Sequence, residues 1–122
     1  MGAEMKKSKP RIIKVYDKYI LPAVIKLGYQ DITIIQVDSI DNTQGSYTND
    51  THEIKIKSGM VGREQLNTLL HELLHACVYA YGIKSEFGDD DKEEKVVNAL
   101  GNGLTEVLVR NKELVAFIKE SV

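Results

Sequence analysis

The feature that most constrains the fold of this chain is the pentapeptide His-Glu-Leu-Leu-His at residues 71–75, which lies inside the apolar run 69–78. Residues four apart lie on the same face of an α-helix, so His71 and His75 would project side by side. Two imidazoles at this spacing can bind one metal ion, with Glu72 beside them as a general base. The uncharged flanking residues favour a helix buried next to a metal. The alternative is a chance match, in which two helix histidines simply form hydrogen bonds.

A third ligand is expected from the next predicted helix, because catalytic zinc usually has three protein ligands and one water. That helix begins with the adjacent carboxylates Glu93 and Glu94. Glu94 is favoured because Gly101, two turns further along, would let the two helices approach closely. Asn98, one turn after Glu94, could accept a hydrogen bond from a metal-bound histidine. Glu93 remains the alternative ligand, and acidic residues that simply suit the helix dipole are the structural alternative for the whole cluster.

Other candidate site residues are expected to have structural roles. His52 is the only other histidine, and it falls on the polar face of a predicted strand, which indicates a surface position. Cys77 points away from the histidines on the helix and is expected to be a small buried hydrophobe. Tyrosine hydroxyls are candidates for stabilising an oxyanion, although packing is favoured for each of them: Tyr47, Tyr79 and Tyr81.

Length and composition predict one domain in a reducing compartment. The chain has 122 residues, one cysteine and a formal net charge of -2, so an internal disulfide is excluded and generic nucleic-acid binding is disfavoured. No apolar run approaches the roughly 18 to 20 residues of a membrane span, and no apolar segment of a secretory signal follows the basic start. We expect a basic flexible tail at 1–10, a single domain at 11–122 and a cytoplasmic location.

The hydrophobic pattern predicts an α+β fold. Residues 11–27 have helical spacing, with Pro22 expected to kink the helix and Gly28 to end it. A small antiparallel sheet of about three strands should follow, with helices packed on one face. The predicted strands are 32–37, 46–48 and 52–57, and the predicted later helices are 63–81, 91–110 and 113–119.

Residues 32–111 resemble a group of known metallopeptidases. The pentapeptide followed by Glu94-x-x-x-Asn98 resembles the gluzincin arrangement, in which a glutamate on a later helix completes the zinc site. The segment Glu94-x-x-Val97-Asn98-x-Leu100-Gly101 is similar to the Glu-x-x-Ala-Asn-x-Phe-Ala segment of ImmA/IrrE-type metallopeptidases, which cleave phage or stress-response repressors. The layout also resembles short single-domain peptidase-like proteins of bacteriophages and mobile elements. Val97 and Gly101 depart from that pattern, and the Leu-Met-Pro ending common in the family is absent.

This resemblance implies a minimal zincin-like core that binds Zn²⁺ through His71, His75 and Glu94, with Glu72 as general base and then general acid. It implies a zinc-dependent endopeptidase that acts on one or a few intracellular proteins, with phage or host regulatory proteins as candidates. An extended peptide would add to the edge of the hairpin 46–57, and a protein partner would supply specificity. The alternative function is a binding module that keeps the metallopeptidase fold and acts without proteolysis. A structural zinc is disfavoured, because such sites usually have four Cys or His ligands.

Overall fold

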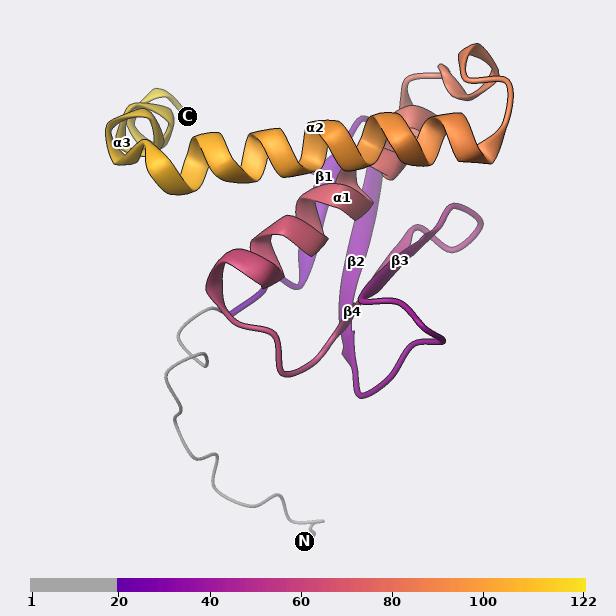
Figure 1. Cartoon of the computed structure of the whole chain (residues 1–122), viewed down its shortest axis with the longest axis horizontal. Helices are drawn as coiled ribbons and strands as arrows, with labels where there is room; N and C mark the ends of the chain where they lie inside the picture. The colour runs from indigo at the N-terminus through magenta and orange to yellow at the C-terminus, as the bar shows by residue number, and fades with distance from the viewer. Residues whose placement is uncertain (1–19) are drawn as a thin grey trace, which may run out of the picture.

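The computed structural model describes residues 20–122. A four-stranded sheet comes first along the chain and three α-helices follow, so the α+β class predicted from the sequence is confirmed. In Figure 1, helix α1 lies between the sheet and helix α2, and α3 projects from the far end of α2. The elements in order are β1 (Val24–Leu27), β2 (Gln30–Val37), β3 (Gly45–Thr48), β4 (Glu53–Lys57), α1 (Gly62–Ala80), the 3₁₀ turn η2 (Lys84–Glu86), α2 (Asp90–Arg110) and α3 (Lys112–Ser121). Within residues 20–122, no helix has the length and apolar content needed to cross a membrane.

The sheet is mixed, and this corrects the expectation of an antiparallel sheet of about three strands. Its strand order is β1-β2-β4-β3, with β2 and β4 parallel and the two outer pairs antiparallel. After β2 the chain crosses to the far edge, forms β3 there and returns through a hairpin as β4. Because β4 returns between β2 and β3, it runs parallel to β2 and leaves β3 at the edge of the sheet.

The predicted N-terminal helix is wrong over the part that the structure describes. Residues 24–27 form the strand β1, which pairs antiparallel with β2 from Val24↔Thr33 to Leu27↔Gln30. Pro22 disfavours a continuous helix here, and Gly28, with φ of +64°, begins the tight turn that joins the two strands. Residues 11–19 of that predicted helix, and the predicted tail at 1–10, lie outside the described residues.

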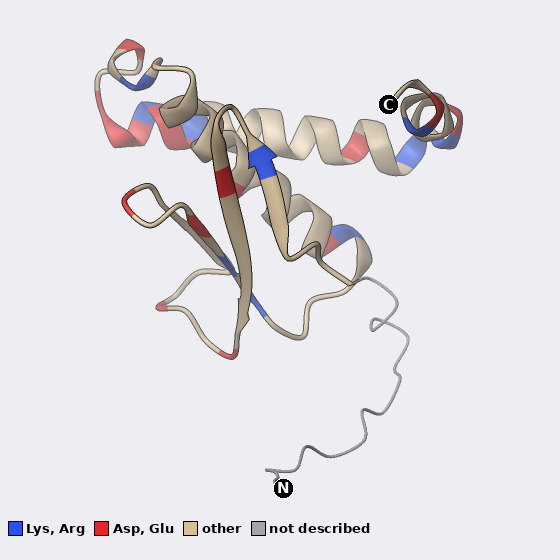
Figure 2. Ribbon diagram, turned by 180° about the vertical axis from the view of Figure 1, so that it is seen from behind, with Lys and Arg blue, Asp and Glu red and all other residues tan. Residues whose placement is uncertain are grey.

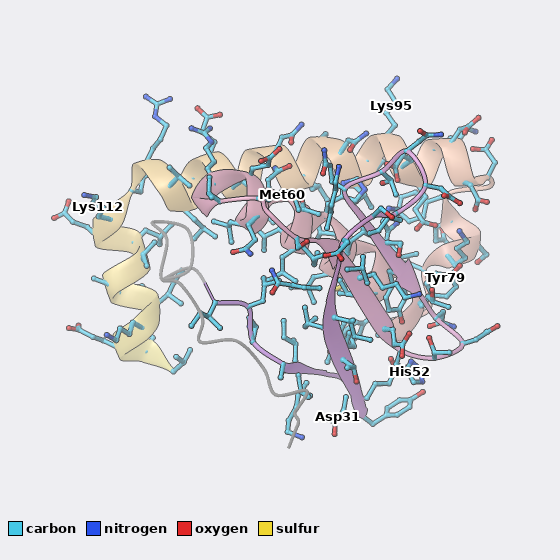
Figure 3. The ribbon with its side chains drawn as sticks, turned by 90° about the horizontal axis from the view of Figure 1, so that it is seen from below. Asp31, His52, Met60, Tyr79, Lys95 and Lys112 are labelled. Carbon is cyan, nitrogen blue, oxygen red and sulfur yellow. The ribbon has the colours of Figure 1, made fainter. Side chains whose placement is uncertain are left out.

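The core lies between the sheet and α1. Ile54 and Ile56 are fully buried and alternate along β4 with more exposed charged residues, as the sequence pattern predicted. They pack with isoleucines of β2, with Leu69 and Ala76 of α1, and with Met60, which precedes α1 (Figure 3). Because α1 packs on this face, its pentapeptide lies close to the sheet, near the edge strand β3.

Candidate metal centre

Two histidines of α1 and one glutamate of α2 meet in a compact group. The Nε2 atoms of His71 and His75 lie 3.2 Å apart. The Glu94 carboxylate reaches both of them, with Oε1 2.8 Å from His75 Nε2 and Oε2 3.2 Å from His71 Nε2. The potential ligand atoms of the three residues all lie within 4.8 Å of one another. The group could therefore hold a metal ion.

The spacing and the chemistry of these donors suit a small divalent transition metal. Tetrahedral zinc with bonds of about 2.0–2.1 Å places its ligand atoms ~3.3 Å from one another. In this group the two histidine Nε2 atoms lie 3.2 Å apart and Glu94 Oε1 lies 2.8 Å from His75 Nε2, while the 3.2 Å contact with His71 is made by the other carboxylate oxygen, Oε2. Imidazole nitrogen with one carboxylate is a usual zinc donor set, whereas Ca²⁺ prefers six to eight oxygen ligands.

The adjacent residue, Glu93, contacts the opposite side of the same histidine. Its Oε2 lies 2.6 Å from His75 Nδ1, and its Oε1 accepts a hydrogen bond from the Lys84 ammonium group. Neighbours on a helix diverge by about 100°, so only one of the two glutamates can face both histidines. The Glu93 side chain is 4% exposed and that of Glu94 is 51% exposed. Burial by itself raises the pKa of Glu93, but the hydrogen bonds from Lys84 and His75 outweigh it and hold the pKa below its ordinary value.

The expected contact of Asn98 with a histidine is absent from the described residues. Asn98 is exposed, and Glu93 occupies the outer nitrogen of His75 instead. The physical reason is the rotation of α2. The buried face of α2 runs through Glu93, Val97, Gly101 and Thr105, and Asn98 projects beside it.

Gly101 brings α2 close to the histidine helix, as expected. A Cβ atom at Gly101 would lie 3.6 Å from the His71 Cα atom. Across the same contact, the Asn67 side-chain amide donates hydrogen bonds to the Asn102 Oδ1 and Thr105 Oγ1 atoms, each at 3.0 Å. This packing fixes which face of α2 meets α1 and therefore which glutamate reaches the histidine pair.

Glu72 lies buried beside the histidine pair, and only 6% of it is exposed. Burial raises its pKa to about 7; the nearby His75 opposes this shift and Glu94 adds to it. The edge strand comes very close at this point, since a Cβ atom on Gly45 would lie 3.3 Å from Glu72 Cγ and 2.7 Å from Thr68 Cγ2. Glycine at position 45 therefore lets β3 pass directly beside the carboxylate.

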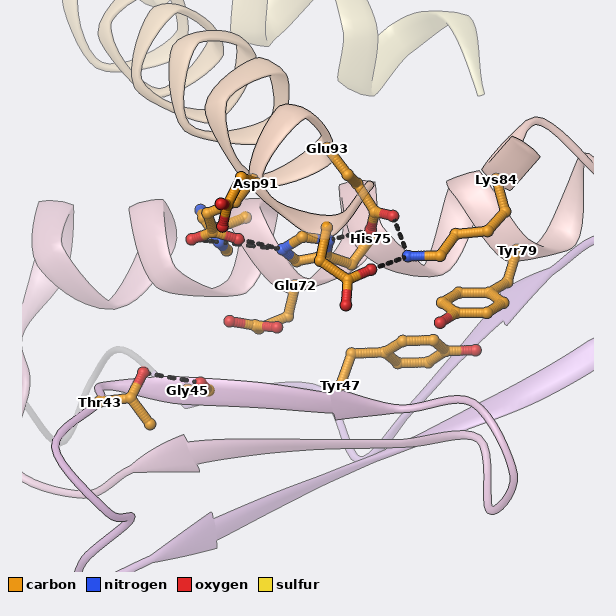
Figure 4. A pocket seen from close by; sticks show the side chains of 12 residues that line it. Thr43, Gly45, Tyr47, Glu72, His75, Tyr79, Lys84, Asp91 and Glu93 are labelled. Carbon is orange, nitrogen blue, oxygen red and sulfur yellow. Dashed lines mark hydrogen bonds and ion pairs between the residues drawn. The ribbon is translucent and has the colours of Figure 1, made fainter. Parts of the chain in front are cut away.

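These residues line one cleft of about 440 Å³, shown in Figure 4. The start of α2 and α1 form one wall, and β3 with the loop before it forms the other. The lining residues are Thr43, Gly45, Tyr47, His71, Glu72, His75, Tyr79, Lys84, Asp90, Asp91, Glu93 and Glu94. Figure 2 shows the acidic residues gathered where α2 begins. The cleft is thus rich in carboxylates, with Lys84 as its ammonium group.

Two of the three candidate tyrosines line this cleft. The Tyr47 and Tyr79 rings lie 5.9 Å apart, and the Lys84 ammonium group is 5.4 Å from the centre of the Tyr79 ring. The Tyr47 hydroxyl donates a hydrogen bond to Asn49 Oδ1. Tyr81 is largely exposed and does not line the cleft.

His52 and Cys77 lie outside the candidate metal group, as expected. His52 belongs to the turn between β3 and β4, where its φ is +54°, rather than to the strand itself (Figure 3). Cys77 is half-buried rather than fully buried, and burial raises the pKa of its thiol. Neither side chain completes the group formed by His71, His75 and Glu94.

The sequence indicated the histidine pair, Glu72 and Glu94, but it did not indicate Lys84 or the role of Gly45. Lys84 lies nine residues before Glu93 and outside its helix, so no helical spacing predicts a contact between the two side chains. Comparison with protein-family models, with curated protein sequences and with solved structures finds no match to this chain.

Proposed function

We propose that this protein is a zinc-dependent endopeptidase. The observation that carries the proposal is the convergence of His71, His75 and Glu94 beside the buried Glu72. Three protein ligands leave one position for water, which is the arrangement of catalytic rather than structural zinc. A pair of surface histidines without a metal would need neither the Glu94 carboxylate, which lies 2.8 Å from His75 Nε2, nor the buried Glu72 beside it.

The chemistry of peptide hydrolysis assigns a role to each group. Zinc, when bound by His71, His75 and Glu94, would supply a water of lowered pKa and a Lewis acid for the substrate carbonyl. Glu72 would accept the proton of the attacking water and then deliver it to the leaving nitrogen as the C–N bond breaks. Tyr47 and Tyr79 are the candidates for contact with the developing oxyanion, because both line the cleft.

The edge strand supports a peptide substrate. Among the described residues 20–122, β3 pairs with β4 on one side only, and Gly45 and Tyr47 line the cleft. An extended peptide can add to such an edge through main-chain hydrogen bonds, which would carry its scissile bond past Glu72. Candidate substrates are intracellular regulatory proteins of a phage or its host, as the resemblance implies.

One observation favours the alternative of a binding module that acts without proteolysis. Within residues 20–122, large apolar side chains of α2 and α3 remain exposed, among them Leu100 at 52% and Phe117 at 65%. Exposed apolar patches often mark protein interaction sites. The same surface would also serve an endopeptidase that recruits its substrate through a protein partner.

The substitution Glu72→Gln tests the proposal and separates the two functions. We expect purified protein to contain about one zinc per chain and to cleave an unfolded protein such as casein. Glu72→Gln should retain zinc but lose roughly a hundred- to ten-thousand-fold in cleavage rate, because the general base is removed. The matched control is Glu64→Gln, which makes the same chemical change at an exposed position of α1.

Cleavage at the parental rate by Glu72→Gln would refute the assigned base. Absence of cleavage by the zinc-loaded parent across a broad peptide library would favour the binding module. A zinc content near zero after purification and zinc addition would remove the metal site from both functions.

A further inference from the structure

Three charged residues form a chain of contacts behind the candidate metal group, and Figure 4 shows two of them, Lys84 and Glu93, beside His75. The Lys84 ammonium group donates hydrogen bonds to Asp90 Oδ1, at 2.7 Å, and to Glu93 Oε1. The other Glu93 oxygen, Oε2, lies 2.6 Å from His75 Nδ1. Each oxygen of the buried Glu93 carboxylate therefore has one partner, and the two partners lie on opposite sides of it.

The contact of Glu93 with His75 places a proton on one nitrogen of that histidine. An ionised carboxylate can only accept hydrogen bonds, so the proton in this bond belongs to His75 Nδ1. The other ring nitrogen, Nε2, lies 2.8 Å from Glu94 Oε1, so in the metal-free chain it can donate to that carboxylate, and a metal ion would take the place of that proton. With its proton held on Nδ1, His75 can then bind a metal through Nε2.

Lys84 fixes the rotation of the Glu93 carboxylate. A carboxylate held only by His75 could rotate about its last bond, whereas one held at both oxygens has a single orientation. A buried carboxylate also needs a compensating charge, and Lys84 supplies it from the short turn η2 between the two helices. The position of His75 thus depends on a side chain outside both helices.

We propose that Glu93 and Lys84 are positioning residues of the metal centre, with Glu93 holding a proton on His75 Nδ1 and orienting that ring, and Lys84 setting the orientation of Glu93. This inference rests on the metal site of the proposed function. It assigns Glu93 no bond to the metal, and it separates Glu93 from Glu94 by role.

The substitution Glu93→Gln provides a sharp test because an amide has only one acceptor oxygen. The charged Lys84 would attract that oxygen, and the amide NH₂ group would then face His75 Nδ1 and favour the tautomer with its proton on Nε2. Lys84→Met in the same chain would release the amide oxygen to accept from Nδ1–H. We therefore expect the double variant to recover part of what Glu93→Gln loses.

The measurement is zinc affinity by competition with a chelator of known affinity. We expect Glu93→Gln to bind zinc roughly ten- to a hundred-fold more weakly than the parent, which is the usual effect of losing such a support. Lys84→Met should cost less, and the double variant should bind more tightly than Glu93→Gln alone. The control is Lys95→Met, because Lys95 is exposed on the same helix and projects away from the sheet (Figure 3).

A second measurement gives an answer whether or not zinc binds. In metal-free protein, ¹⁵N NMR of the imidazoles should show a proton on His75 Nδ1 in the parent and in Lys95→Met, and Nδ1 without a proton in Glu93→Gln. A parent that binds no zinc but shows this change refutes the proposed function, while it still shows that Glu93 places the proton of His75. A His75 Nδ1 that keeps its proton in folded Glu93→Gln, or no recovery of zinc affinity in a double variant of a zinc-binding parent, would overturn the inference.

Discussion

At the scale of single residues, one step along α2 separates two glutamates with different contacts. Glu94 reaches the Nε2 atoms of both histidines, and Glu93 reaches the opposite nitrogen of His75. The two carboxylates also differ in solvent exposure, since Glu93 is buried and Glu94 is half-exposed. The site therefore holds its candidate ligand at the mouth of the cleft and its supporting carboxylate in the interior.

Loss of a ligand should cost more zinc affinity than loss of the support. We expect His71→Ala, His75→Ala and Glu94→Ala each to release zinc at concentrations that still saturate Glu93→Gln, because each removes a direct bond to the metal. Isothermal titration with zinc measures the order. Glu106→Ala is the control, since Glu106 is an exposed glutamate of α2 that pairs with Arg110, distant in sequence from the candidate ligands. Parental zinc affinity in Glu94→Ala, with strong loss in Glu93→Gln, would mean that Glu93 is the ligand.

At the scale of elements, two glycines set how closely the strand β3 and the helix α2 approach α1. Gly45 brings the edge strand β3 against α1 next to Glu72, and Gly101 brings α2 against α1 next to His71. The two contacts differ in tightness. A Cβ atom at position 45 would come within 2.7 Å of Thr68 Cγ2 and 3.2 Å of the Lys55 carbonyl oxygen, whereas one at position 101 meets nothing closer than 3.6 Å.

Alanine at these two positions should therefore have different effects on stability. We expect Gly45→Ala to lower the free energy of unfolding by about 1–3 kcal/mol, the usual cost of overpacking, because the stiff Thr68 side chain or the backbone of β4 must move. Gly101→Ala should be neutral or stabilising by up to ~1 kcal/mol, since alanine fits there and favours a helix. Urea unfolding of both variants in chelator measures this. Equal losses in the two variants would show that the two approaches are equally tight.

At the scale of the whole molecule, the candidate metal group connects two helices that are separate in sequence. Its histidines belong to α1, which packs on the sheet, and its glutamate belongs to α2, which packs mainly on α1. The α1–α2 contact combines the fully buried Val97 with small or polar residues such as Gly101, Asn67 and Thr105. A bound metal would add a further bond across this contact.

Zinc should accordingly stabilise the whole fold. At a free concentration 100 times the dissociation constant, binding only to the folded chain adds about 2.7 kcal/mol. For a domain of this size that corresponds to a rise in Tm on the order of ten degrees. Calorimetry with zinc and with EDTA measures the shift, and His71→Ala should show almost none. A parental Tm that EDTA does not change, in protein shown to have bound zinc, would mean that the site forms equally well in the unfolded chain.

The sequence by itself determined the features that depend on local periodicity. The helix predicted at 63–81 is observed at Gly62–Ala80, and the helix predicted at 91–110 is observed at Asp90–Arg110. The alternation around Ile54 and Ile56 predicted a strand with one buried face, which the structure confirms. The spacing of His71 and His75 also follows from helix geometry alone, whatever the rest of the fold does.

The tertiary structure alone decided which elements are neighbours and which faces they present. The apolar residues near Ile25 fit a helical period as well as an alternating one, and only pairing with β2 makes them a strand. The parallel pairing of β2 with β4 depends on where the chain crosses the sheet, which no local pattern records. Likewise, Glu93 and Glu94 are equivalent until α2 packs through Val97 and Gly101, because a helix carries all of its faces and only contact with another element selects one.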